Sequence, residues 1–171
     1  LNNPAFISGD ETYEFPHFYA DIHDENGINT VGTGIGHDLL LVIDNDPKQT
    51  YVLNNYFNAN NNSYQSGQVS YKMAEQAEGA HTLTFRAWDM FNNSSTASLN
   101  FQVVKGLDPN IYSVTTYPNP VTSTGVVNVE VQFDQQDEIL GTTVYLYDVS
   151  GKLMHTHTQN NIDGIRWNMG H

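Results

Sequence analysis

Apolar and polar residues alternate along most of this sequence, and a helical spacing of apolar residues is almost absent. The alternation is clear in residues 18–23 and 83–88, and in residues 127–133 an apolar side chain takes every second position. A period of two places successive side chains on opposite faces of a β-strand, so that one face can line a core. Short runs of this kind, separated by turn residues, are typical of β-sandwiches. The sequence therefore predicts an all-β fold of two immunoglobulin-like β-sandwich units in tandem, the second of them truncated.

Several segments of the first half carry more specific signals. Residues 39–43 form a continuous apolar run that ends at an Asp-Asn-Asp-Pro turn, which predicts a central strand followed by a loop. Residues 83–88 and 97–103 flank an Asn-Asn-Ser turn and predict a hairpin, with Trp88 shielded on the face opposite to the apolar one. Residues 57–67 are rich in Asn, Ser and Tyr, which predicts a long polar loop or at most one helical turn.

The alternation breaks at residues 105–109, Lys-Gly-Leu-Asp-Pro, which have the composition of a linker. We therefore expect two domains, residues 1–106 and residues 107–171. In the second, the Y-P-N-P of residues 117–120 fixes φ at two prolines and removes two backbone donors, which suits the start of a domain better than the interior of a strand. Residues 148–152, D-V-S-G-K, predict a tight turn between two strands. A domain this small is expected to be marginally stable by itself.

Composition narrows the classes of function. The chain has no cysteine, so it forms no disulfide and holds no thiol nucleophile, and it contains neither a G-x-S-x-G nor an H-E-x-x-H motif. With 19 acidic and six basic residues its net charge is −13, which repels nucleic acid and anionic membrane surfaces. No apolar run reaches the roughly 18 residues of a transmembrane helix. The sequence begins without Met or a signal peptide and is expected to be a piece of a longer chain.

Three acidic loops offer the oxygen ligands that calcium prefers. The candidate ligands are Asp24 and Asn26 in the first loop, Asp44 and Asp46 in the second, and Asp89 in the third. Asp and Asn also stabilise turns by accepting hydrogen bonds from their own backbone, which needs no ion. No cofactor is expected, and calcium remains the alternative.

Aromatic residues interleaved with Asn form a further candidate surface, made of Tyr51, Tyr56, Phe57, Tyr64 and Tyr71. Such a surface suits carbohydrate, because sugar rings stack on aromatic faces and Asn side chains bind hydroxyl groups. The alternative is that these aromatic rings anchor a long loop on the core and keep their hydroxyls in water.

Residues 107–171 resemble the type A sorting domain of proteins exported by the type IX secretion system. Such domains carry Y-P-N-P near the start, D-x-x-G-K/R in the middle and a Trp after a short apolar stretch. The matching residues are Tyr117, Pro118, Asn119, Pro120, Asp148, Gly151, Lys152 and Trp167. Family members continue past this Trp to a closing strand, so the last strand is expected to be missing here.

Residues 1–106 resemble the immunoglobulin-like region of the PorU family of type IX sortases, which are gingipain-like cysteine peptidases. The resemblance rests on residues 24–30 (D-E-N-G-I-N-T), 34–38 (G-I-G-H-D), 64–67 (Y-Q-S-G) and 83–95 (L-T-F-R-A-W-D-M-F-N-N-S-S). Within these motifs the residues of interest are Asp24, Gly27, Gly36, Asp38, Trp88, Asp89 and Asn92.

The resemblance implies a non-catalytic accessory region of a cell-surface sortase. It would serve secretion targeting and outer-membrane docking of a parent cysteine endopeptidase whose catalytic domain, absent here, cleaves cargo sorting domains. The implied partners are that peptidase domain and an outer-membrane β-barrel of the PorV type, and the implied route is export through the periplasm to the cell surface. The alternative is a carbohydrate-binding or adhesin-like module of another type IX secreted protein.

Overall fold

A computed structural model describes residues 1–31, 36–120, 126–135, 141–160 and 165–168. Residues 165–168 are described by their backbone alone. It divides into two compact units, Leu1–Asp108 and Pro109–His171, a boundary two residues beyond the one expected from the linker. The all-β prediction is confirmed, since the only helical elements among these residues are two 3-10 turns, η1 (Pro47–Gln49) and η2 (Asn54–Tyr56). No helix in the described part of the chain is long and apolar enough to cross a membrane.

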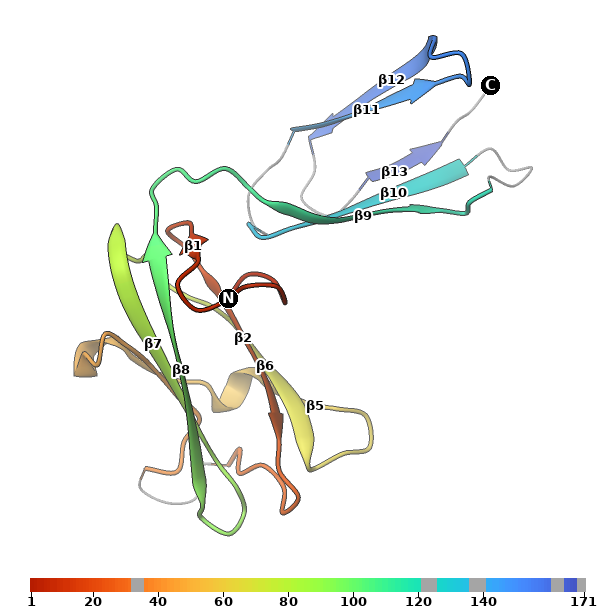
Figure 1. Ribbon diagram of the computed structural model, residues 1–171. Helices are drawn as coiled ribbons and strands as arrows, with labels where there is room; N and C mark the ends of the chain where they lie inside the picture. Colours follow the sequence, from red (N-terminus) through yellow and green to blue (C-terminus); the bar gives the residue numbers. More distant parts are fainter. Residues whose placement is uncertain (32–35, 121–125, 136–140, 161–164, 169–171) are drawn as a thin grey trace. The chain divides into compact units, whose positions relative to one another are not determined.

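The first unit consists of two sheets (Figure 1). Within each sheet all neighbouring strands are antiparallel except β1 and β8, which are parallel. In spatial order the larger sheet holds β1 (Glu11–Thr12), β8 (Ser94–Val103), β7 (Gly79–Trp88), β3 (Leu40–Ile43) and β4 (Thr50–Val52), and the smaller holds β2 (His17–His23), β6 (Ser66–Lys72) and β5 (Phe57–Ala59).

One apolar core lies between these two sheets. Phe18 of β2 meets Phe85 of β7 with ring centroids 5.1 Å apart, and Leu41, Ile43 and Val69 are fully buried. The alternating side chains of each strand supply this core from one face only, which explains the period of two in the sequence. The predicted central strand is confirmed, because β3 lies between β7 and β4. The predicted hairpin is also confirmed, as β7 and β8 pair along their whole lengths.

The prediction of a polar loop over residues 57–67 was wrong. Its first three residues are strand β5, which pairs with β6, and only residues 60–65 form the turn between them. The strand forms because one apolar residue anchors this polar segment: Phe57 packs against the core. Its ring also covers Gly67, where an added Cβ would lie 2.4 Å from Phe57 Cζ. A strand glycine covered by an aromatic ring on the neighbouring strand is stable because the ring replaces the missing side chain.

The second unit contains a three-stranded and a two-stranded sheet. The first sheet has the order β13 (Ile165–Asn168), β10 (Val126–Phe133) and β9 (Ile111–Tyr117), and the second pairs β11 (Gly141–Tyr147) with β12 (Leu153–Asn160). The expected position of Y-P-N-P at the start of this unit was wrong, since β9 comes before it and ends at Tyr117. The prolines still act as expected in another respect, because they end a strand rather than occupy its interior.

The predicted tight turn at residues 148–152 is confirmed. It joins β11 to β12, with Gly151 at φ +83°. Asp148 Oδ1 accepts hydrogen bonds from Ser150 Oγ at 2.7 Å, from Ser150 N at 2.8 Å and from Lys152 N at 2.9 Å. These bonds, that from the Ser150 hydroxyl above all, hold the pKa of Asp148 below its ordinary value. The D-x-x-G-K motif is therefore a self-contained hairpin turn.

The described residues of the second unit bury little apolar surface. Among the side chains described in this unit, Phe133 is the one buried hydrophobic residue, with 8% of its surface exposed. Of the inward face predicted for Val127, Val129, Val131 and Phe133, only Phe133 is buried. The three valines are half-buried, as are most of their neighbours on the other face, and Gln132 is exposed. Burial of apolar surface is the main term that stabilises a fold, so this unit is expected to depend on added contacts more than the first.

Replacing Gly67 with alanine tests the anchoring of β5. The new Cβ would lie 2.4 Å from Phe57 Cζ and 2.5 Å from Asn58 O, so strand or ring must move. We expect a loss of about 1–3 kcal/mol in the free energy of unfolding, typical of overpacking, measured by urea denaturation. Gly141→Ala is the matched control in a strand, since its Cβ meets only Asn160 Oδ1 at 3.3 Å. Equal stability of the two variants would contradict the proposed role of the glycine.

Candidate functional site

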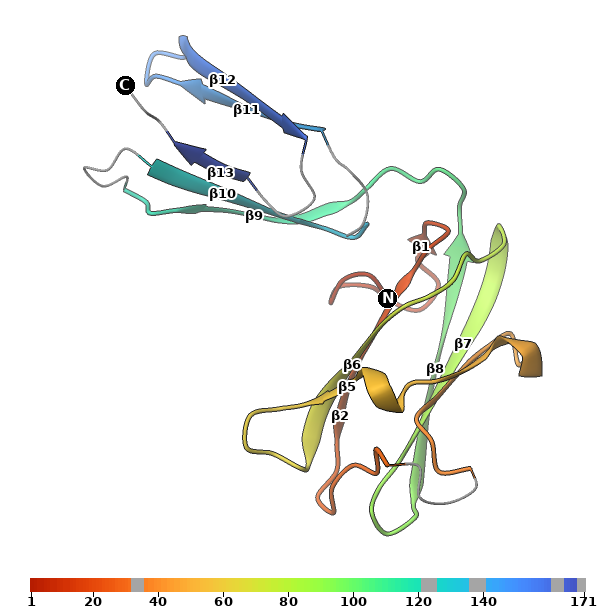
Figure 2. The same cartoon turned by 180° about the vertical axis from the view of Figure 1, so that it is seen from behind.

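Three loops meet at one end of the first unit, and we call this surface the loop end. They are residues 24–31 after β2, residues 60–65 between β5 and β6, and residues 89–93 between β7 and β8 (Figures 1 and 2). Backbone hydrogen bonds join them: Ile28 N donates to Tyr64 O at 3.1 Å, and Met90 N donates to Gly27 O at 3.1 Å. Three of the four sequence motifs of the first unit therefore form one surface.

Gly27 lies at the centre of the loop end. Its φ of +92° is rarely adopted by residues with a side chain, and a Cβ at this position would lie 2.7 Å from Tyr64 Cδ2. The missing side chain thus makes room for the Tyr64 ring. The Tyr64 ring lies against Gly27, and the Met90 amide donates to the Gly27 carbonyl, so both residues contact one glycine.

Asp89 organises the turn between β7 and β8. Its side chain is 4% exposed; Oδ1 accepts from Phe91 N at 2.9 Å and from Asn93 N at 2.7 Å, and Oδ2 accepts from Asn93 Nδ2 at 2.8 Å. The pKa of Asp89 is held below its ordinary value, chiefly by the side-chain hydrogen bond from Asn93, with a smaller effect of the side chain of Asn26. Within this turn Asn92 takes a φ of +66°, which Asn tolerates better than most residues. The acidic residue is thus a structural acceptor that fixes the turn.

Trp88 connects a fourth motif to the same end. It is half-buried, on the face opposite to Leu83, Phe85 and Ala87, which is the face predicted for it. The ring of His37 meets it edge-on with centroids 4.4 Å apart, and the Arg86 guanidinium lies 5.5 Å from its ring centre. His37 belongs to the G-I-G-H-D motif, of which Gly36, His37 and Asp38 are described and residues 34 and 35 lie outside the described residues.

Asn54 was not singled out by the sequence, although it joins the same segments. Its Nδ2 donates to Asp38 Oδ1 and to Thr30 O, each at 3.1 Å, and its Oδ1 accepts from Leu39 N at 2.9 Å. One side chain thereby ties the end of the loop after β2 to the start of β3. An Asn in a polar segment gives no sign of such a role, because its partners lie 15 or more residues away.

The exposed side chains of the loop end are apolar ones, one acidic one and several asparagines. Val31, Tyr64 and Phe91 have about 70% of their surface exposed, and Met90 has 58% exposed. Glu25, which follows Asp24 in the sequence, is also exposed. None of residues 24–31, 60–65 and 89–93 is Lys or Arg. Exposed apolar side chains set among polar ones on adjoining loops suit the binding of a partner.

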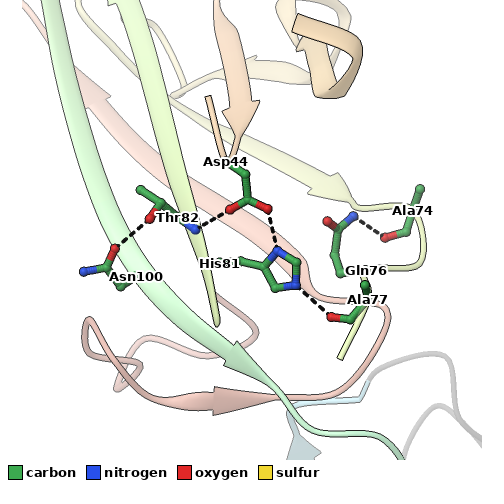
Figure 3. A network of polar contacts seen from close by, with 7 residues as sticks. All are labelled: Asp44, Ala74, Gln76, Ala77, His81, Thr82 and Asn100. Atoms are coloured by element: carbon green, nitrogen blue, oxygen red, sulfur yellow. Dashed lines mark hydrogen bonds and ion pairs between the residues drawn. The ribbon is translucent and has the colours of Figure 1, made fainter. Parts of the chain in front are cut away.

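A separate polar network lies at residues 44, 81 and 82 (Figure 3). Asp44, at φ +53°, accepts from Thr82 N at 2.8 Å, and its other oxygen is 2.7 Å from His81 Nδ1. His81 Nε2 lies 2.7 Å from the carbonyl oxygen of Ala77. Both nitrogens of the His81 ring are thus engaged within the network, and the Thr82 hydroxyl donates to Asn100 Oδ1 at 3.0 Å. The network fastens the end of β3 to β7 and the segment before it.

Three of the candidate calcium ligands, Asp24, Asp46 and Asp89, accept hydrogen bonds within their own turns, whereas Asp44 bonds to two residues of β7. Asp24 accepts from Asn26 N at 2.7 Å, and Asp46 accepts from Lys48 N at 2.9 Å at the start of η1. Asp44 and Asp89 make the bonds described above. Across the described residues, no three His, Asp or Glu side chains converge as a metal ion would require.

The aromatic candidates separate into two groups. Tyr51, Phe57 and Tyr71 are partly buried and pack against the core, and burial is the first cause of a raised pKa at Tyr71. Tyr56 is 44% exposed and meets Tyr71 edge-on with ring centroids 4.8 Å apart. Tyr64 belongs to the loop end instead. The structure thus favours core anchoring for three of the five residues.

The motif residues of the second unit lie at two places: Tyr117 and Trp167 pair with the adjacent β10 residues Asn128 and Val127, and Asp148, Gly151 and Lys152 follow β11 of the other sheet. Pro118, Asn119 and Pro120 follow β9, and Asn128 Nδ2 donates to Tyr117 O at 3.1 Å. Asp148, Gly151 and Lys152 form the hairpin turn between β11 and β12, in the other sheet. Trp167 pairs with Val127 in the register of β13 with β10.

Comparison with solved structures gives an informative match. No family model matches the chain, and no curated protein matches it. It is similar to PorU from Porphyromonas gingivalis, solved as a crystal structure of the dimeric latent protein, with 31% sequence identity and a TM-score of 0.64. The match covers 99% of this chain and 17% of that chain. The chain is therefore related to one region of PorU and spans about a sixth of its length.

Replacing Asp89 with asparagine tests its role in the turn. Asn93 Nδ2 would then face a second amide donor, so we expect the variant to unfold at a lower urea concentration than the wild type at pH 7. Because the folded pKa of Asp89 lies below its ordinary value, the carboxylate contributes fully above the unfolded value of about 4. That contribution is lost as the pH falls through the folded value, so wild type and variant should converge in acid.

The control is Asp21→Asn, which removes one exposed carboxylate from the same unit and so reproduces the change in net charge. A stability difference between wild type and Asp89→Asn that stays constant from pH 7 to pH 2 would contradict this account of the carboxylate.

Proposed function

We propose that this chain is a non-catalytic accessory region of a type IX secretion sortase. The likeness to PorU carries the proposal, because it extends over nearly the whole chain at 31% identity. By analogy with the family that the sequence motifs resemble, the parent protein is a gingipain-like cysteine peptidase that cleaves the sorting domains of exported cargo. The chain would contribute targeting and docking rather than chemistry.

The composition supports a role without catalysis. A cysteine peptidase needs a thiolate nucleophile, and this chain has no cysteine. Both ring nitrogens of His81 are engaged, Nδ1 with Asp44 and Nε2 with the carbonyl oxygen of Ala77. The catalytic residues of the parent would accordingly belong to a different part of the polypeptide.

We assign secretion targeting to the second unit, with its parent exported through the periplasm and held at the outer surface of the cell. Its partner would be an outer-membrane β-barrel of the PorV type. The described part of its smaller sheet has only β11 and β12, so each strand has one edge that pairs with no other described strand. Such edges favour recognition by added strands, in which backbone hydrogen bonds give affinity.

The purified chain is expected to hydrolyse no peptide substrate, because it lacks the thiol on which the proposed parent depends. The measurement is release of a fluorescent leaving group from peptides with basic and apolar residues before the scissile bond, against a buffer blank. Turnover that persists through a second purification and resists a serine-peptidase inhibitor would contradict an accessory role.

The targeting role is tested with a secreted fluorescent reporter fused to the whole chain, in a bacterium with a type IX system. We expect surface fluorescence that disappears in a strain lacking the system. Gly151→Val should reduce the surface signal several-fold, because the φ of +83° is strained for a β-branched residue and the hairpin turn depends on it. Gly106→Val is the control, as this glycine also has a positive φ but lies in the first unit, outside the proposed sorting unit.

An intracellular reporter in the competent strain, or equal surface signal in the two strains, would contradict targeting by this chain.

A further inference from the structure

We propose that the loop end of the first unit binds a protein partner that presents an apolar recess bordered by Lys or Arg side chains. The proposal rests on the function proposed above in one respect, since both assign a binding role to the chain. It adds a specific surface and the chemistry of its partner.

Exposed apolar side chains are concentrated on adjoining turns of the loop end. Turns usually carry Gly, Asn, Asp, Ser and Pro, and single exposed apolar residues need no explanation. Here Tyr64, Met90 and Phe91 are 58–71% exposed on two turns that both contact Gly27. Aromatic residues and Met are enriched where protein interfaces bury their centre.

The turns are also held in place before any partner arrives. The Asp89 carboxylate binds the amides of Phe91 and Asn93, and the Gly27 carbonyl binds the amide of Met90. Exposed side chains on a fixed backbone lose less conformational entropy on binding than those on a mobile loop. The surrounding residues 60–65 are Asn, Ser, Tyr and Gln, a composition close to that of antibody binding loops.

Charge identifies the kind of partner. Residues 24–31, 60–65 and 89–93 contain no Lys or Arg, and of their acidic residues Glu25 is exposed and Asp24 is half-buried, in a chain of net charge −13. A second copy of this chain would present the same acidic surface and be repelled, as would an anionic lipid bilayer. A protein surface with basic residues around an apolar recess complements both properties.

The test uses the photoreactive amino acid p-benzoylphenylalanine in the full polypeptide that contains this chain, in the cells that produce it. It is placed at position 91, at position 64, and at position 7 as the control. Ile7 is 68% exposed in the same unit and does not belong to the loop end. We expect positions 91 and 64 to crosslink to the same protein and position 7 not to crosslink to it.

The crosslinked protein, once purified, is then titrated against the wild type and two variants. We expect Phe91→Ser to weaken binding at least tenfold and Ile7→Ser to leave it unchanged. Because acidic side chains steer the association, binding should also weaken as salt rises from 50 to 500 mM, and the double variant Asp24→Asn, Glu25→Gln should reduce that dependence.

Adducts to lipid, adducts to a second copy of this chain, identical adducts at all three positions, or unchanged affinity of Phe91→Ser would each overturn the proposal. These results leave the targeting experiment unaffected, because its reporter depends on the second unit. Loss of targeting with an intact loop-end complex would instead refute the proposed function alone.

Discussion

The loop end depends on the hydrogen bonds that the carboxylate of Asp89 accepts. Three hydrogen bonds converge on it from Phe91 and Asn93, and together they fix the turn between the two longest strands. The same turn holds the loop after β2, because Met90 N donates to Gly27 O and Ile28 forms an isolated β-bridge with Asp89. A buried charged group is costly unless its hydrogen bonds are satisfied, and here the turn satisfies them. Removing this one acceptor would leave three donors without partners.

The two units differ in how they reach stability. In the first, two sheets enclose a continuous core, and the close approach of Phe57 to Gly67 adds a strand to a segment whose composition is otherwise polar. In the second, the described residues form no comparable core: β10 is half-buried, the side chains of β9, β11 and β12 are mostly exposed, and the turn at Asp148 is held by its own hydrogen bonds. A unit of this kind gains more from an added strand or partner, which agrees with a role in docking.

The sequence could predict the features that depend on local periodicity. The strand at residues 40–43 follows from a continuous apolar run that ends at a turn, and the β7–β8 hairpin and the turn at Gly151 follow from alternation and turn chemistry within about ten residues. It could not predict β5, because the ring that anchors it is one residue in a polar run. It could not predict the Asn54 or Asp44–His81 contacts either, since each joins residues 15 to 37 positions apart. The motifs of the first unit are separate in the sequence, and only the fold shows that they meet at one end.

The central claim is that the loop end is a fixed surface that carries exposed apolar side chains. Amide hydrogen exchange at Phe91 and Asn93 tests it most directly, because both amides donate to a buried carboxylate although the Phe91 side chain is 70% exposed. The account predicts exchange at least a hundredfold slower than in an unstructured peptide, with protection lost in Asp89→Asn. Exchange at the rate of an unstructured peptide in the wild type would show that the turn is not held, and would contradict the account.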